Sequence, residues 1–217
     1  LCVVDQKGSV GERQGRRRGS KGSGKAVSLL TPSLTPNGWR KFGDLRPGDY
    51  VFHPSGKPTK VTQVHPIDQW DTWEVEISDG TVLTATGEHL FTVDEFVGSA
   101  KRKRRTLDVR AMAREGRFNL RLPDVDKDEL RAQGVPGGVL ESFQNGRTIV
   151  NARRVPPVDA RCITVAAEDG LYLVGETMVV THNSPFAAAL CLFELLGPCR
   201  FDGFDRHGPF GVRAKPM

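Results

Sequence analysis

Short stretches in which apolar and polar residues alternate, separated by glycine, proline and aspartate, dominate two parts of the chain, residues 26 to about 93 and residues 161–181. Alternation with a period of two is typical of half-buried β-strands, and the Asp79-Gly80 pair between two such stretches suits a two-residue hairpin loop. The expected strands are Tyr50–Phe52, Lys60–Val64, Trp73–Ile77, Thr81–Thr84, Arg161–Val165, Leu171–Val174 and Thr177–Thr181. The pattern therefore predicts an all-β fold.

The segment 94–158 between these two parts follows a different pattern. It contains the basic run Lys101–Arg105, followed by Leu107, Val109 and Met112 at helical spacing. We expect the apolar residues to form a short helix and the basic run to be a solvated loop, with nucleic-acid contact and a processing site as less favoured alternatives. The segment is interpreted as an insertion into the β domain.

Beyond Ser184 the alternation stops and a helical pattern begins. Phe186–Leu196 is rich in alanine and leucine and is followed by a Gly-Pro pair, which predicts a helix and its end. Charge divides the chain at similar places, because residues 1–25 carry seven basic and two acidic residues, whereas residues 26–183 carry 20 basic and 21 acidic residues. The segment 26–183 therefore looks like an insert within a host sequence.

Composition narrows the class of protein. The chain has 217 residues, of which 38% are hydrophobic and 26% charged, as in soluble folded proteins. No run approaches the roughly 20 apolar residues of a membrane-spanning helix, and the arginine-rich beginning has no signal-peptide core, so we expect a cytoplasmic protein without a membrane partner. The four cysteines are Cys2, Cys162, Cys191 and Cys199. They form no CxxC pair and no metal spacing, so neither a disulfide framework nor a zinc site is expected.

The end of the predicted insert carries three residues with complementary chemistry, His182, Asn183 and Ser184. An asparagine side chain that attacks its own backbone carbonyl forms a succinimide and cuts the chain, and a neighbouring histidine can polarise that carbonyl or carry the proton. The hydroxyl of the next residue can hold an ester. Alone, this tripeptide is more often an ordinary turn. A second threonine and histidine stand upstream in the run Thr86–Phe91.

Taken together and in order, four blocks of the sequence resemble those of the intein, or Hint, family. Residues 27–51 look like the N-terminal splicing block, Thr86–Phe91 like the TxxH block, and residues 161–174 and 178–184 like the two C-terminal blocks. The resemblance covers 158 residues, Ala26 to Asn183, and implies a horseshoe-like fold of short strands that splices itself without a cofactor. The segment 94–158 shows neither a LAGLIDADG-like nor an HNH-like motif, so the chain resembles a mini-intein.

The first residue of the insert departs from the usual intein pattern. Most inteins begin with Cys or Ser, whereas this one would begin with Ala26, whose methyl group cannot attack a carbonyl. Cys162 is the sole cysteine within the insert and stands where most inteins have an Asp-containing pattern, which resembles class 3 inteins. Thr181, two residues before the terminal Asn, matches a second mark of that class, while Phe91 stands where a Trp is expected.

Removal of residues 26–183 would place Lys25 directly before Ser184. The joined sequence would read G-x-x-x-x-G-K-S, a complete P-loop that neither flank contains alone. Its ATP-phosphate-binding residues would be Gly19, Gly22, Gly24, Lys25 and Ser184, with the Ser184 hydroxyl on magnesium. The flanks look like the Walker A region of a phage terminase large subunit, an α/β P-loop ATPase, so ATP and magnesium are expected as cofactors of the spliced host.

The resemblance implies a role for each site residue. Cys162 would attack the carbonyl of Lys25, His89 would protonate the departing Ala26 amine, and Thr86 would orient it. The predicted catalytic residues are Cys162, Thr86, His89, Thr181, His182, Asn183 and Ser184. The substrate would be the chain's own flanks, with phage DNA and other terminase subunits as partners only of the full host protein. Two alternatives remain, a Hint-type domain that cleaves without ligation and a P-loop ATPase with a passive insertion.

Overall fold

The computed structural model describes residues 25–97 and 101–183. Five predicted features lie outside this part of the chain: Ser184, the P-loop glycines Gly19, Gly22 and Gly24, and the helix at 186–196. All statements below concern the described residues.

Short strands and a few short helices make up the chain between Val27 and His182, which confirms the all-β prediction. The strands are β1 (Val27–Ser28), β2 (Pro32–Thr35), β3 (Gly38–Lys41), β4 (Tyr50–Phe52), β5 (Pro58–Val64), β6 (Asp68–Gln69), β7 (Thr72–Ile77), β8 (Val82–Thr86), β9 (Leu90–Val97), β10 (Lys101–Asp108), β11 (Leu120–Arg121), β12 (Thr148–Val155), β13 (Asp159–Arg161), β14 (Ile163–Val165), β15 (Leu171–Val174) and β16 (Val179–His182). The helices are η1 (Phe42–Asp44), α1 (Val109–Glu115), α2 (Lys127–Ala132) and α3 (Gly137–Glu141).

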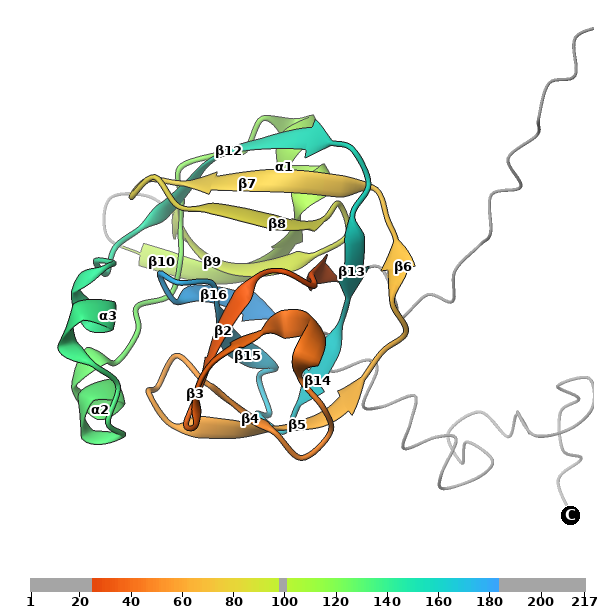
Figure 1. Cartoon of the computed structure of the whole chain (residues 1–217). Helices are drawn as coiled ribbons and strands as arrows, with labels where there is room; N and C mark the ends of the chain where they lie inside the picture. Colours follow the sequence, from red (N-terminus) through yellow and green to blue (C-terminus); the bar gives the residue numbers. More distant parts are fainter. Residues whose placement is uncertain (1–24, 98–100, 184–217) are drawn as a thin grey trace, which may run out of the picture.

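One large antiparallel sheet runs through the molecule in the order β15-β16-β9-β11-β12-β7-β8-β1-β13-β6, with β10 paired to β9. In Figure 1, β12, β7 and β8 lie along one side of the molecule, whereas β4 and β5 lie along the opposite side with β14. Strands β1 and β16, the first and last of the described chain, both belong to the large sheet. The two ends of the predicted insert meet at the start of β9, where His89 contacts the Lys25 carbonyl and Leu90 pairs with His182.

The predicted strand at Arg161–Val165 is interrupted at one residue. Arg161 ends β13, which pairs with β1 in the large sheet, and Ile163 begins β14, which pairs with β5 in a separate three-stranded sheet. Cys162 lies between them, where the chain leaves one sheet for the other. The sequence shows one unbroken β-prone run across this point, with no turn residue to mark the change of partner.

The basic run is a strand, so the expectation of a solvated loop is wrong. Lys101–Asp108 forms β10, which pairs with β9 along its whole length. Arg104 Nε lies 2.9 Å from Asp94 Oδ1, and Arg105 Nε lies 2.9 Å from Glu95 Oε2, so carboxylates on β9 neutralise the guanidinium groups. The short helix expected after the run is present as α1. Because β9 to β12 all belong to the large sheet, much of the segment 94–158 is built into the β domain.

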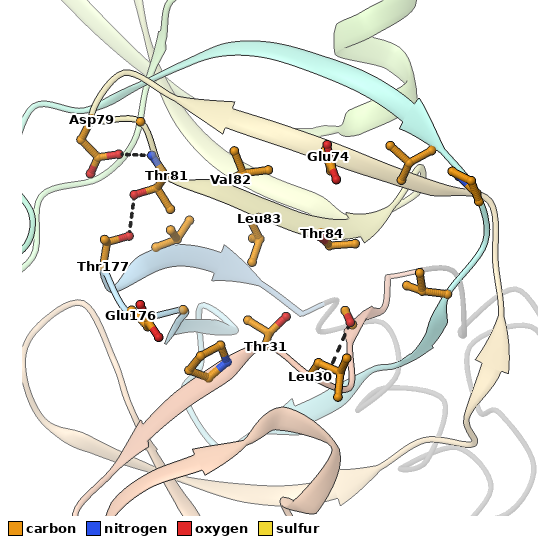
Figure 2. A pocket seen from close by; sticks show the side chains of 18 residues that line it. Leu30, Thr31, Glu74, Asp79, Thr81, Val82, Leu83, Thr84, Glu176 and Thr177 are labelled. Atoms are coloured by element: carbon orange, nitrogen blue, oxygen red, sulfur yellow. Dashed lines mark hydrogen bonds between the residues drawn. The ribbon is translucent and has the colours of Figure 1, made fainter.

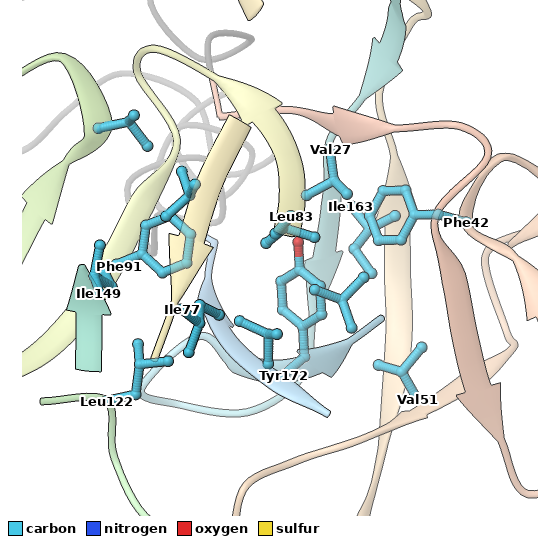
Figure 3. Close-up of a cluster of buried hydrophobic side chains, with 14 of the residues drawn as sticks. Val27, Phe42, Val51, Ile77, Leu83, Phe91, Leu122, Ile149, Ile163 and Tyr172 are labelled. Carbon is cyan, nitrogen blue, oxygen red and sulfur yellow. The ribbon is translucent and has the colours of Figure 1, made fainter. Parts of the chain in front are cut away.

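The main hydrophobic core joins residues from both sheets. Figure 3 shows Phe42 and Tyr172 beside Ile163 and Val27, and the Phe42 and Tyr172 rings stack with centroids 6.2 Å apart. A second cluster includes Leu130 and Leu140 from α2 and α3, so these helices are anchored to the β domain. In the described part of the chain, no helix is long and apolar enough to cross a membrane.

Candidate active site

The bond between Lys25 and Ala26 lies beside the end of β8. Ala26 is fully buried, and its backbone N donates to Thr86 Oγ1 over 3.0 Å. The backbone N of Thr86 in turn donates to the carbonyl of Ala26 over 2.9 Å, next to the strand pair of Val27 and Ala85. Thr86 therefore contacts the nitrogen that must leave if this bond is cut.

His89 contacts the other side of the same bond. Its Nδ1 lies 3.0 Å from the carbonyl oxygen of Lys25, and the side chain is fully buried. Burial lowers the pKa of His89 to about 4. The hydrogen bond to Lys25 acts to raise this pKa, whereas the positive charges of His182 and Lys25 lower it further. The neutral imidazole thus carries its proton on Nδ1 and donates it to the carbonyl. In this position His89 can polarise the Lys25 carbonyl, whereas its predicted protonation of the departing Ala26 amine stays a prediction.

The aromatic residue two positions after His89 completes its surroundings. Phe91 is fully buried, and its ring meets the imidazole edge-on with centroids 5.2 Å apart. A hydrophobic ring therefore packs against His89 at the position where the resemblance led us to expect Trp.

The thiol of Cys162 is buried at the crossing between the two sheets. The residue is 5% exposed, and Sγ lies 3.4 Å from the carbonyl oxygen of Ile163. Burial raises the pKa of Cys162 to about 12, while the charge of Lys25 and the hydrogen bond to Ile163 act in the opposite direction. At neutral pH Cys162 is a thiol, so it must lose its proton as it reacts, and the ammonium group of Lys25 favours that loss.

The carboxamide of Asn183 meets the same carbonyl group. Asn183 is 3% exposed, and its Nδ2 donates to the carbonyl oxygen of Ile163 over 3.3 Å. Its backbone N donates to Gly170 over 2.9 Å. The Ile163 carbonyl therefore brings the predicted first nucleophile, Cys162, and the predicted cyclising side chain, Asn183, to one point.

Thr181 and His182 lie on β16, beside these groups. His182 pairs with Leu171 on β15 and with Leu90 on β9, and burial and the charge of Lys25 lower its pKa. Thr181 is fully buried and its Oγ1 donates to the carbonyl of Tyr172 over 3.3 Å. The structure thus brings together every predicted catalytic residue that it describes.

Two residues at the site were not singled out from the sequence. Gly170 has φ of 68°, and a Cβ added there would lie 2.5 Å from Asn183 Oδ1. Tyr172 is 1% exposed, and burial together with the charge of Cys162 raises the pKa of its phenol. The Asp169-Gly170 turn was visible in the sequence, but its contact with Asn183 was not. Nothing in the strand pattern around Tyr172 distinguishes it from an ordinary core residue.

A pocket lined by β8 and by the turn before β16 lies away from these residues. It has a volume of about 870 Å³. Figure 2 shows Thr81 and Thr177 joined across one end of it, with their hydroxyl oxygens 2.8 Å apart. None of the predicted catalytic residues that the structure describes lines this pocket. Among the described residues, no group of three or more His, Cys, Asp or Glu side chains is arranged to hold a metal ion.

Comparison with solved structures identifies the family. The MchDnaB-1 intein, known from a crystal structure, is 33% identical to this chain. The match covers 73% of this chain and 100% of that intein, with a TM-score of 0.51. The chain belongs to the intein family. The zinc-bound Msm DnaB1 intein splicing domain is 28% identical to this chain. That match covers 73% of this chain and 100% of the domain, with a TM-score of 0.53.

Among curated proteins, the replicative DNA helicase DnaB of Mycobacterium leprae is 32% identical to this intein over 164 residues. The match covers 75% of this chain but only 25% of the length of the helicase. No family model matches the sequence. The comparisons therefore establish an intein of Hint fold, whereas the order of its chemical steps and its host protein are matters for proposal.

Burial of His89 predicts a loss of stability in acid. The unfolded chain takes up a proton on this imidazole below its ordinary pKa of 6.5, whereas the folded intein does so only near 4. The free energy of unfolding should therefore fall by about 3 kcal/mol through this residue as the pH drops from 6.5 to 4, and level off below. Urea unfolding at a series of pH values should show the fall in the parent and a shallower one in His89→Gln. Equal pH slopes in the two proteins would contradict burial of a neutral His89.

Proposed function

We propose that residues 26–183 excise themselves and join Lys25 to Ser184 by a class 3 route. The observation that carries the proposal is the convergence of Cys162 and Asn183 on the carbonyl of Ile163. The two groups that must act at opposite ends of the excised segment are thereby held in one buried site, beside the Lys25 carbonyl that His89 contacts.

The first step opens the bond between Lys25 and Ala26. Cys162 Sγ attacks the Lys25 carbonyl carbon, and the developing oxyanion lies against the proton on His89 Nδ1. Collapse breaks the C–N bond, and the proton lost by the thiol ends on the Ala26 amine, which Thr86 Oγ1 orients. The products are a thioester on Cys162 and a free amine at Ala26. A neutral imidazole suffices for this role, because its Nδ1–H can donate a hydrogen bond to the oxyanion without a second proton on the ring.

The later steps release the insert. The hydroxyl of Ser184 takes the acyl group from Cys162 and restores the thiol. Asn183 Nδ2 then attacks its own backbone carbonyl, forming a succinimide and breaking the bond to Ser184, with His182 assisting the proton transfer. The ester moves spontaneously from the oxygen to the freed nitrogen of Ser184 to leave an ordinary peptide. Holding these groups in one site supplies effective molarities of about 10⁵ to 10⁸ M, so no cofactor is needed.

Mass spectrometry of the expressed chain tests the proposal. Ligation yields a 59-residue product from residues 1–25 and 184–217, together with the excised segment. Two separate flanks would instead identify a Hint-type domain that cleaves without ligation. An intact precursor would identify a passive insertion.

We further propose that splicing creates the P-loop of an ATPase host. The acyl acceptor Ser184 would become a magnesium ligand beside Lys25, so the precursor should not bind nucleotide and the spliced protein should. The flanks resemble a phage terminase, whereas the curated relatives are helicases. The G-x-x-x-x-G-K-S junction supports a P-loop ATPase in either host, acting in the cytoplasm, and in a terminase with phage DNA and other subunits as partners.

Nucleotide binding distinguishes the two states of the host. In the full-length host protein, we expect Mg-ATP binding after splicing and none in the linear precursor that carries both Cys162→Ala and Asn183→Ala, as measured by equilibrium dialysis with radiolabelled ATP. Restoration of the P-loop explains this difference, because Lys25 and Ser184 contact the same phosphates only when they are adjacent. Equal ATP binding by the unspliced precursor would refute the assignment.

A further inference from the structure

The turn that carries Thr86 and His89 is hydrogen-bonded to residues that take no part in the proposed splicing steps. Asp71 is the centre of this support. Its backbone carbonyl accepts from Gly87 N over 2.9 Å, and its Oδ2 accepts from Trp73 Nε1 over 3.1 Å and from Arg110 over 2.9 Å. Main chain and side chain of one residue thus connect the turn to two other elements.

Helix α1 contacts the same turn from the opposite direction. The backbone N of Arg110 donates to the carbonyl of Gly87 over 2.8 Å, and that of Val109 donates to the carbonyl of His89 over 3.2 Å. The Arg110 guanidinium also lies 3.6 Å from Glu88 Oε1. The first turn of α1 therefore fixes the carbonyl groups of Gly87 and His89, and its Arg110 side chain reaches Asp71.

Gly87 allows this close approach. A Cβ added at Gly87 would lie 2.7 Å from Trp73 Nε1 and 3.1 Å from both Arg110 Nε and Asp71 Oδ2. The side chains of the cluster therefore pack directly on the backbone of the turn, so a displacement of Arg110 or Asp71 is transmitted to Thr86 and His89.

We propose that Asp71 and Arg110 are positioning residues for the first splicing step, which hold Thr86 Oγ1 on Ala26 N and His89 Nδ1 on the Lys25 carbonyl. The inference rests on the proposed function. It assigns a role to the segment 94–158, since Arg110 and α1 come from that segment. Burial raises the pKa of Asp71, but hydrogen bonds from Trp73 and Arg110, together with the charge and hydrogen bond of Arg154, lower it overall, so the carboxylate is charged at neutral pH.

The proposal predicts that the two ends of the intein respond differently. The Asn183 carboxamide and backbone N are bonded to Ile163 and Gly170, not to this cluster. Loss of the cluster should therefore slow the reaction at Lys25 and spare the reaction at Asn183. A misplacement of catalytic groups by about 1 Å can cost about 100-fold in rate, which sets the upper size of the effect.

Arg110→Ala and Arg114→Ala form a matched pair on α1. The Arg114 side chain is 71% exposed, and Glu115, at 3.6 Å, is the ion-pair partner described for it. In an Asn183→Ala background, dithiothreitol should cleave the Cys162 thioester and release residues 1–25, which are quantified by mass spectrometry. We expect release to be between about 10-fold and 100-fold slower in Arg110→Ala and unchanged in Arg114→Ala. Equal rates in the two variants would overturn the proposal.

Two further readouts separate positioning from loss of folding. In a Cys162→Ala background, Arg110→Ala should release residues 184–217 at the parental rate, and a matching fall at this end would overturn the proposal. Arg110→Lys, which keeps a cation near Asp71 and Glu88, should recover part of the lost rate, and no recovery would also count against it. If the Asn183→Ala parent itself releases no residues 1–25, the proposed function fails, independently of Arg110.

Discussion

Replacing Cys162 with alanine should abolish cleavage between Lys25 and Ala26. Ala26 has no nucleophile, and Cys162 is the free, buried cysteine of the described chain, one residue after Arg161, which pairs with Val27. Without a thioester, residues 1–25 should stay attached, and the 59-residue ligated product should fall below detection by mass spectrometry. Cleavage at Asn183 should continue, because its contacts with Ile163 and Gly170 do not involve the thiol.

The pH dependence of the first splicing step in the unsubstituted protein is a second test of attack by the Cys162 thiolate. Because burial raises the pKa of Cys162 to about 12, the thiolate fraction, and with it the rate of the first step, should rise about tenfold per pH unit between roughly pH 6 and pH 9. Splicing of Cys162→Ala at the parental rate would show that Ser184 attacks Lys25 directly, and the class 3 route would be wrong.

Replacing Gly170 with alanine should block release at Asn183 while leaving the first step intact. The added Cβ would lie 2.5 Å from Asn183 Oδ1 and 2.8 Å from the Asn183 carbonyl oxygen. The carboxamide and the carbonyl that it must attack would both be displaced, and the left-handed backbone at φ of 68° adds roughly 1 kcal/mol of strain. We expect a branched intermediate to accumulate, with residues 1–25 held as a thioester or ester.

Gly116→Ala is the matched control for this variant. Gly116 has φ of 60°, close to that of Gly170, but a Cβ there would meet nothing within 4 Å. Both variants carry the same backbone strain, so the difference in the release of residues 184–217, followed by mass spectrometry, isolates the contact with Asn183. Release from Gly170→Ala as fast as from Gly116→Ala would show that this contact does not control the step.

Several features of the fold were predictable because they depend on neighbours in the sequence. The strands at Tyr50–Phe52 and Leu171–Val174 have the predicted bounds. The loop that joins β7 to β8 contains Asp79-Gly80 as expected, but it spans residues 78–81 and is longer than the predicted two residues. The basic run Lys101–Arg105 was misinterpreted because Arg104 and Arg105 meet the acidic residues Asp94 and Glu95 of β9 only once the strands pair. A run of like charges repels itself, which disfavours a strand when the run is considered alone. Opposite charges on a neighbouring strand remove this repulsion and stabilise the pair.

The sequence alone determined the chemical groups of the site and their order along the chain. Ala26 without a nucleophile, the single cysteine of the insert at Cys162, and the terminal Asn183 are properties of residue type, which no folding changes. Only the tertiary structure decided which atoms they meet. His89 lies on the Lys25 carbonyl, and Cys162 and Asn183 share the Ile163 carbonyl, whereas Gly170 and Arg110 contact the site without any local sign of it. These contacts join residues up to 64 positions apart, and they depend on strand register and packing, which a local pattern of residues does not encode.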